Sequence, residues 1–291
     1  MLMQKKCFGC LFRQAVDAAW LLTKDEEKRE AVIRGAGRLM SETDLRRTPP
    51  ELGAELHAMI REILEDPDPY LKIKREMNSV TRSLLPMLRE RIRASERPLE
   101  TAIRYAIAGN VIDFSTFQEI SADEIAKTVE EAANRPIIGL NVSAFEAELQ
   151  KPEVQTLLYV CDNCGEIVWD ALLIAELDRY VSVTAAVRGG AAVNDALLED
   201  AEFAGLPEIA RVITTGCSVP GAPDAAVSEE FRTYFRNADL VIAKGQGNLE
   251  TMQPAVRPVL HLFMVKCPVI EQMVGLPKGS LAAQTLPKAV P

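Results

Sequence analysis

The first third of the chain repeats apolar residues at three- and four-residue spacing, the period of an amphipathic helix. This pattern predicts helices over residues 11–22, 26–40, 50–64 and 70–92. Polar or proline-containing breaks separate these segments. Pro50 opens the third of them, and proline suits the first turn of a helix because the N–H that it lacks has no partner there.

The second half of the chain changes to short apolar runs that are rich in β-branched residues. These runs predict strands over residues 156–161, 181–187, 211–214, 240–243 and 259–265. Helical patterns lie between the earlier runs, over residues 166–177, 195–203 and 225–235. Nearly continuous apolar strands that alternate with helices are typical of a parallel sheet covered on both faces.

The fold class predicted from this alternation is α/β. We expect a helical N-terminal domain over residues 1–100 and a three-layer α/β/α sandwich with a mainly parallel sheet over residues 101–291. The second of these is the domain expected to bind a metal and carry catalysis.

Polar residues of unusual composition follow four of the predicted strands. The four clusters are Asp162-Asn163, Arg188 with Asn194-Asp195, Thr214-Thr215-Gly216, and residues 244–248. In open parallel sheets, ligands bind at the edge formed by the carboxyl ends of the strands. The sequence therefore predicts one ligand site at that edge.

The residue types at this edge suggest phosphate chemistry. Asp162, Asn163 and Asp195 offer oxygen ligands, which suit Mg²⁺ or Mn²⁺ better than a soft metal. Lys244 is a compact cation after an apolar strand, and Gly245 follows it, which lets backbone amides approach an anion. A cation, amides and a metal ion together can neutralise the charge that builds on a phosphoryl group.

Each of these residues also has a purely structural interpretation. Asp162 or Asp195 could cap the helix that follows it. Lys244 could be a solvated surface residue. Glu166 could be a first-turn residue favoured by the helix dipole. The predicted site would be absent only if the structural interpretation held for all of these residues at once.

The amino-acid composition argues against some classes of binding partner and of active site. The 291 residues carry a net charge of −9, which argues against nucleic acid or an anionic membrane as the main partner. No run of about 18 apolar residues is present, so we expect a cytoplasmic protein that does not span a membrane. With only two histidines, a histidine-rich zinc hydrolase site is excluded.

Several of these segments occur in the order found in a known family. They are residues 162–166, Arg188 with Asn194-Asp195, residues 244–248, residues 109–114, and Cys7-x-x-Cys10 followed by Arg13-Gln14. Together they resemble the damage-control phosphatase family, long described as domain of unknown function 89 and also called acidic-residue-methyltransferase-like. The resemblance covers nearly the whole chain and is greatest to the prokaryotic, cysteine-bearing branch.

The resemblance implies a divalent metal (Mn, Mg, Co or Ni) held at Asp162, Asn163 and Asp195, and hydrolysis of small phosphorylated metabolites. It also implies that Asn110 and Asp113 line the site. Eukaryotic members carry an acidic residue in the lysine segment, where this chain has Gln246 and Gly247. The substrate choice of those relatives is therefore not carried over to this chain.

The function predicted is a metal-dependent phosphomonoester hydrolase of the damage-control type, acting in metabolite repair. Its catalytic residues are predicted to be Asp162, Lys244, Asn110 and Asp113. Its substrate-binding residues are predicted to be Arg188, Gly245, Gly247, Asn248 and Glu166. Two alternatives remain from sequence: a carboxyl methyltransferase, and a non-catalytic protein that binds a metal or metabolite.

Cys7 and Cys10 have a spacing found in metal and redox sites, but one such pair is incomplete for a structural zinc site. Cys267 follows the last predicted strand, so it could join them in a three-cysteine cluster near the active site. The alternative is that these cysteines are small buried apolar residues.

Overall fold

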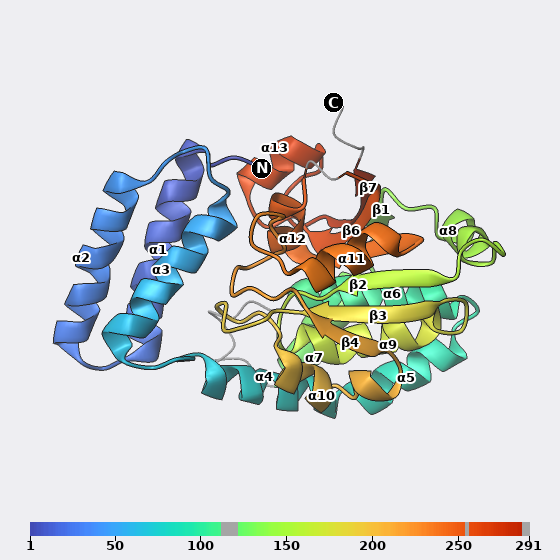
Figure 1. The fold of residues 1–291 in the computed structure, drawn as a ribbon. Helices are drawn as coiled ribbons and strands as arrows, with labels where there is room; N and C mark the ends of the chain where they lie inside the picture. Colours follow the sequence, from blue (N-terminus) through green and yellow to red (C-terminus); the bar gives the residue numbers. More distant parts are fainter. Residues whose placement is uncertain (112–121, 254–255, 287–291) are drawn as a thin grey trace.

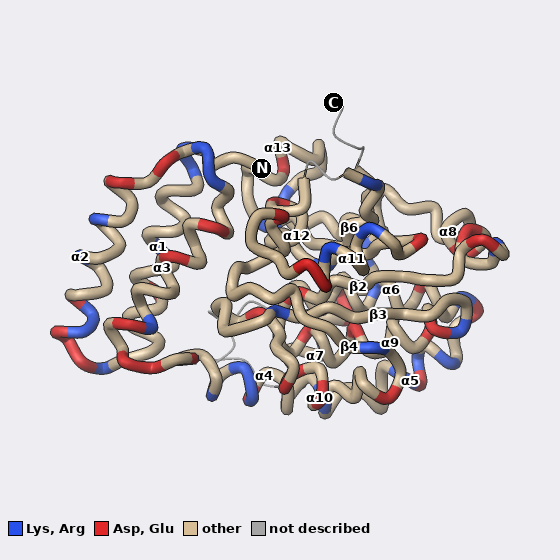
Figure 2. Tube along the Cα trace, viewed as in Figure 1, with Lys and Arg blue, Asp and Glu red and all other residues tan. Residues whose placement is uncertain are grey.

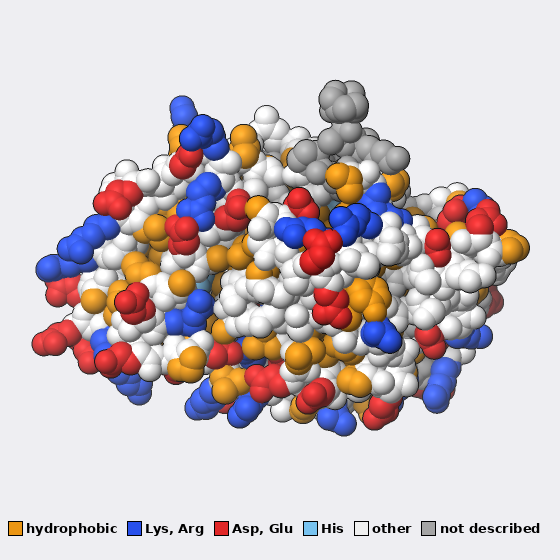
Figure 3. All heavy atoms as spheres, in the orientation of Figure 1, with side chains coloured by type: hydrophobic (Ala, Val, Ile, Leu, Met, Phe, Trp, Pro, Cys, Tyr) orange, Lys and Arg blue, Asp and Glu red, His pale blue; other side chains and the backbone are white. Residues whose placement is uncertain are grey.

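The structure is a computed structural model that describes residues 1–111, 122–253 and 256–286. Asp113, one of the predicted site residues, lies outside the described residues. Figure 1 shows a bundle of three helices beside a larger body in which helices surround a sheet. Acidic and basic residues are interspersed along the bundle and the helices below the sheet (Figure 2), and both kinds of side chain are scattered over the face drawn in Figure 3.

The bundle consists of α1 (Lys5–Leu22), α2 (Glu26–Glu42) and α3 (Pro49–Leu64). Asp25 caps α2 by accepting hydrogen bonds from two backbone N–H groups, and Thr48 with Glu51 forms a capping box at α3. Leu52, Leu56 and Ile60 repeat every four residues, so they form one buried stripe on α3. The predicted helices of this region are confirmed to within a few residues, except that α1 begins earlier.

The predicted helix over residues 70–92 is wrong in one respect, because it is two helices, α4 (Leu71–Ser83) and α5 (Leu85–Ala94). The break falls at Leu84, and Pro86 explains it, since proline has no N–H to continue the helical hydrogen bonds. Both helices, with α6 (Pro98–Ala108), pack in the same hydrophobic core as the sheet. The domain boundary near residue 100 stays a prediction, while the hydrophobic cores divide near residue 70.

The sheet has seven strands in the order β1-β7-β6-β5-β2-β3-β4. Their bounds are β1 (Ile137–Ile138), β2 (Thr156–Val160), β3 (Ser182–Val187), β4 (Arg211–Thr214), β5 (Leu240–Lys244), β6 (Val259–Met264) and β7 (Leu281–Leu286). The pairing of β6 with β7 is antiparallel and the other pairings are parallel. The five predicted strands are confirmed, whereas β1 and β7 were not predicted.

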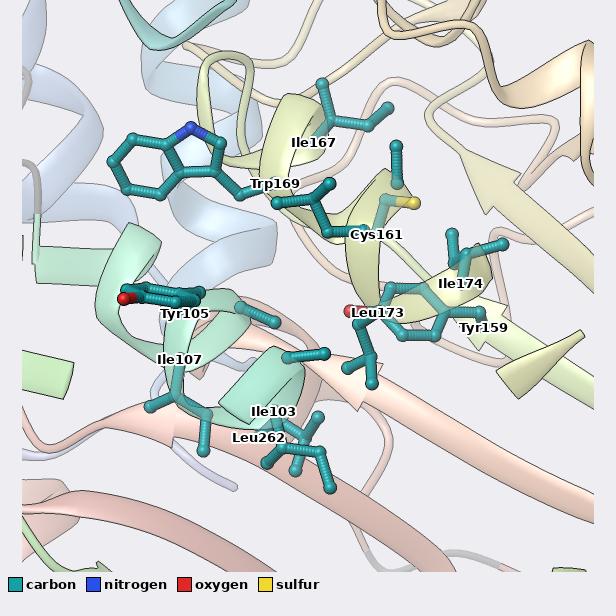
Figure 4. Close-up of a cluster of buried hydrophobic side chains, with 14 of the residues drawn as sticks. Ile103, Tyr105, Ile107, Tyr159, Cys161, Ile167, Trp169, Leu173, Ile174 and Leu262 are labelled. Carbon is teal, nitrogen blue, oxygen red and sulfur yellow. The ribbon is translucent and has the colours of Figure 1, made fainter. Parts of the chain in front are cut away.

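Helices cover both faces of the sheet, which confirms the three-layer α/β/α architecture. Along β2, Leu157 and Tyr159 belong to the core under α6 and α9 (Glu166–Leu177), while Leu158 and Val160 belong to the core on the opposite face. This alternation follows from the two-residue period of a strand. Figure 4 shows the first of these cores, where Ile103 and Ile107 of α6 approach Leu262 of β6.

The remaining helices complete the layers and connections. They are η1 (Gly109–Val111), α7 (Ala122–Ala133), α8 (Val142–Leu149), α10 (Leu198–Phe203), η3 (Leu206–Glu208), α11 (Glu229–Asn237), α12 (Gly245–Thr251) and α13 (Pro268–Val274). No helix in the described part of the chain is long and apolar enough to cross a membrane.

The strand order changes direction at β2. The chain runs from β2 to β3 and β4 on one side, and then returns to place β5 on the other side of β2. At such a switch point, the connections that leave neighbouring strands run in opposite directions and open a crevice at their carboxyl ends. The polar residues that follow β2, β3 and β5 therefore meet there.

Candidate active site

The connections after β2 and β3 are joined directly to each other. The backbone N–H of Ala196 donates to the carbonyl of Asp162 (2.8 Å), and Asn163 forms an antiparallel bridge with Asp195. The helix predicted from residue 195 begins only at Leu198, so Asp195 lies in the connection rather than in a helix. This pairing brings the three predicted metal ligands, Asp162, Asn163 and Asp195, to one place.

The Asp162 carboxylate is buried and accepts hydrogen bonds from two amides. Its Oδ2 accepts from Nδ2 of Asn110 (3.1 Å) and from Nδ2 of Asn163 (2.8 Å). The guanidinium of Arg188 connects this carboxylate to Asp195. Its Nε lies 2.5 Å from Asp195 Oδ2 and its Nη2 lies 3.9 Å from Asp162 Oδ1. One buried cation thus lies between the two carboxylates.

Lys244 is fully buried between two carboxylates of α9. Its Nζ donates to Oε1 of Glu166 and to Oδ1 of Asp170 (2.7 Å). The hydroxyl of Tyr159 donates to the same Asp170 oxygen (2.8 Å). An ammonium group has three N–H donors, so these carboxylates leave one for another acceptor in the site.

The polar cluster at residues 244–248 includes the start of a helix. Lys244 ends β5, and α12 begins at Gly245, which has φ +72°. A Cβ atom on Gly245 would lie 1.8 Å from Asp162 Oδ2, so only glycine leaves room for that carboxylate. Asn248 accepts from Arg188 Nη2 (3.2 Å) and donates to the carbonyls of Cys161 and Lys244.

Burial and charge shift the pKa values of the acidic groups in opposite directions. Burial, followed by the negative charges of Glu166 and Asp195, raises the pKa of Asp162 to about 8. Burial also raises the pKa of Asp195, and it raises that of Asp170 to about 6. For Glu166, burial acts to raise the pKa, but the charge and hydrogen bond of Lys244 hold it below its usual value.

The buried charges of the site do not balance. Four carboxylates, those of Asp162, Glu166, Asp170 and Asp195, share the interior with two cations, Lys244 and Arg188. Buried charges are stable only when they are paired. With all four ionised the site favours a further cation, and in the absence of one the raised pKa of Asp162 favours its protonated form.

The chain is similar to a known protein family over nearly its whole length. The model of the damage-control phosphatase ARMT1-like domain matches residues 3–282 of the chain. The chain belongs to this family. The resemblance expected from the sequence is thereby confirmed, and the phosphatase-type function of the family applies to the chain.

Two relatives and one solved structure are similar to the chain over nearly its whole length. An uncharacterized protein of Methanocaldococcus jannaschii is 32% identical over 94% of the chain and 92% of its own length. A damage-control phosphatase of Pyrococcus horikoshii is 30% identical, with 97% of each chain covered. The crystal structure of a DUF89 family protein from Pyrococcus horikoshii superposes with a TM-score of 0.89 at 29% identity, and covers 98% of this chain and 99% of that one.

Three residues that lie in the site of this chain were not predicted from its sequence. Asp170 pairs with Lys244, and its position four residues after Glu166 on α9 places both on one helix face. Tyr159 donates to Asp170 from β2. The charge of Lys266 lowers the pKa of both Asp162 and Glu166, and its backbone N–H donates to Gln246 Oε1 (2.6 Å). The spacing of Asp170 was the signal that could have revealed it.

The remaining predicted roles stay predictions. Among the described residues, no group of three or more His, Cys, Asp or Glu side chains is arranged to hold a metal ion. The predicted metal set consists of two carboxylates and the Asn163 amide, and it stays a prediction. Gly247 lies in α12 beside Gly221, where a Cβ atom on Gly221 would lie 2.3 Å from the Gly247 carbonyl oxygen, so the close approach requires glycine at position 221.

The six cysteines are free thiols. Cys7 and Cys267 belong to or pack against the core of the helical bundle, as small apolar residues do. Burial, and then the nearby Cys267 thiol, raises the pKa of Cys10. These contacts place the three cysteines in one neighbourhood, while metal binding or disulfide formation among them stays a prediction.

The contact between Gly245 and Asp162 predicts a large effect of one added methyl group. We expect Gly245→Ala to lower phosphatase activity about 100-fold, because the Asp162 carboxylate must move by an ångström or more. Gly275→Ala is a matched control, since Gly275 has φ +71° at the end of α13 and its Cβ would meet nothing within 4 Å. Equal activity losses in the two variants, measured at matched folded fraction, would contradict this interpretation.

Proposed function

We propose that this protein hydrolyses phosphate monoesters of small metabolites with the help of one divalent metal ion held by Asp162, Asn163 and Asp195. The observation that carries the proposal is the excess of buried carboxylates over buried cations at the switch point of the sheet. A divalent cation would balance that excess. The proposed partner is a small phosphorylated metabolite, not nucleic acid or a membrane.

The donor set suits Mn²⁺, Mg²⁺, Co²⁺ or Ni²⁺. Two carboxylates and an amide offer oxygen atoms, which these ions bind readily. Asn163 turns its Nδ2 toward Asp162 and Glu166, which leaves its Oδ1 as the atom for a ligand. When bound, the ion would neutralise charge on the phosphoryl oxygens and polarise them.

The residues of the chain supply orientation and positive charge. Asn110 donates to both Asp162 and Glu166, and so fixes the direction of the two carboxylates. Nη1 of Arg188 is buried and has no hydrogen-bond partner in the described part of the chain. We propose that this N–H group and the remaining N–H of Lys244 donate to phosphoryl oxygens, whose charge grows in the transition state.

An assay of phosphate release tests the proposal. Protein treated with a chelator would be supplied with Mn²⁺, Mg²⁺, Co²⁺ or Ni²⁺ in turn and given p-nitrophenyl phosphate or small sugar phosphates. We expect phosphate release only with added metal. Release that is unaffected by chelation, or no release with any of the four ions, would contradict the proposal. Metal binding without turnover would indicate a binding protein, and methylation of a carboxylate in a parallel reaction supplied with a methyl donor would indicate a methyltransferase.

A further inference from the structure

A buried amide on α4 contacts the connections that carry the proposed metal ligands. Asn78 is 2% exposed and lies on the face of α4 that packs against α9. Its Oδ1 accepts from the backbone N–H of Gly165 (2.6 Å), and its Nδ2 donates to Oδ1 of Asp200 (2.6 Å). Both sides of one amide group are therefore used.

Each of these contacts leads to a proposed metal ligand. Gly165 lies three residues after Asp162 and two residues after Asn163, and it precedes the first residue of α9. Asp200 uses its second oxygen to accept from the backbone N–H of Leu197 (2.8 Å), two residues after Asp195. A chain of three hydrogen bonds thus runs from one connection through Asn78 to the other.

Helix α4, which carries Asn78, is joined to α9 and packs directly against the connection that contains Gly165. The indole Nε1 of Trp169 in α9 donates to the carbonyl of Thr81 in α4 (3.0 Å). A Cβ atom on Gly165, which has φ +71°, would lie 3.3 Å from the Cβ of Met77, so the connection lies directly on α4. The backbone bonds between the connections fix them to each other, whereas Asn78 fixes both to the helical layer.

We propose that Asn78 is a positioning residue of the proposed phosphatase site, which holds the paired Asp162 and Asp195 connections in place against α4. The inference rests on the proposed function, because it assigns Asn78 to the geometry of that metal site. Asparagine suits the role because it accepts from an N–H with one atom and donates to a carboxylate with another. Aspartate at this position could accept from Gly165 but could not donate to Asp200.

The decisive experiment exchanges the two side chains. Asn78→Asp retains the shape but places a second carboxylate against the buried Asp200, so the paired connections should shift away from α4. Adding Asp200→Asn restores the pairing in reverse: the amide at position 200 donates to the carboxylate at position 78, and its oxygen still accepts from Leu197. We expect the single variant to fail and the double variant to recover.

The measurements are metal affinity by calorimetry and the turnover of p-nitrophenyl phosphate as a function of metal concentration. We expect Asn78→Asp to weaken Mn²⁺ affinity and lower kcat by about 10- to 100-fold, as residues that orient ligands do. The double variant should regain most of both. Asn141→Asp is the matched control, because Asn141 caps α8 by accepting from Ala144 N and its substitution keeps that acceptor.

The outcomes separate the inference from the proposed function. A wild-type metal response in folded Asn78→Asp protein, or no recovery in the double variant, would overturn the role of Asn78. If Asn78→Asp does not fold, the double variant alone decides, since only a paired amide and carboxylate should restore metal affinity. If wild-type protein binds Mn²⁺ without hydrolysing esters, the proposed function fails while calorimetry still tests Asn78. If it does not bind the ion, both fail.

Discussion

Asp162→Asn is expected to lower phosphatase activity by at least about 100- to 1000-fold, because it removes one charge from the proposed metal ligands. The asparagine oxygen can still accept from Asn110 and Asn163, so the local hydrogen bonds survive. Activity is measured at saturating Mn²⁺ to distinguish a missing ligand from weaker binding.

Although Asp162→Asn should lower activity, it should raise the stability of the metal-free protein. With metal chelated, the variant should unfold at a higher temperature than wild type, by about 2–4 °C for each kcal/mol of repulsion relieved. Repulsion is relieved because burial and the charges of Glu166 and Asp195 disfavour the charged form of Asp162. Wild type should gain about 3 kcal/mol from an ion at 100 times its Kd, and the variant should gain little.

Asp239→Asn is a control for these effects, because Asp239 contacts the beginning of β2 whereas Asp162 follows its end. Asp239 accepts from the backbone N–H groups of Gln155 and Thr156, where β2 begins. Asp239→Asn should leave the response to metal unchanged. A wild-type metal response in Asp162→Asn itself would show that the ion binds elsewhere.

Lys244→Ala is expected to abolish activity and to lower the free energy of unfolding by about 3–5 kcal/mol. The reason is that Glu166 and Asp170 would be left buried without their shared cation. Lys244→Arg should not restore the protein, since the planar guanidinium does not fit a fully buried position shaped for an ammonium group. Chemical denaturation and phosphate release measure the two effects.

Asp170→Asn tests the effect of removing one buried negative charge while the hydrogen bonds around Lys244 are kept. The variant keeps an oxygen that accepts from Tyr159 and from Lys244, while Glu166 continues to pair with Lys244. It should therefore fold nearly as stably as wild type and lose less activity than Lys244→Ala. Wild-type stability in Lys244→Ala would contradict the buried arrangement itself.

The sequence by itself determined most elements of the fold. Apolar spacing and capping residues such as Thr48 act over a few neighbouring residues, so α3 and its capping box follow from local pattern. The same reasoning identified the strands that lead to Asp162, Asp195 and Lys244. Because parallel strands place their carboxyl ends at one edge, these residues could be assigned to one site before their distances were known.

Only the tertiary structure decided which polar groups contact each other there. Asn78 and Gly165 are 87 positions apart in sequence, and Lys244 and Asp170 are 74 apart, so no periodicity connects them. The antiparallel strand β7 likewise depends on β6 for its hydrogen bonds. Helices and central strands follow from local pattern and burial, whereas the partners of a buried charge or amide are set by the packing of distant segments. Those partners determine the geometry and the charge balance of the site.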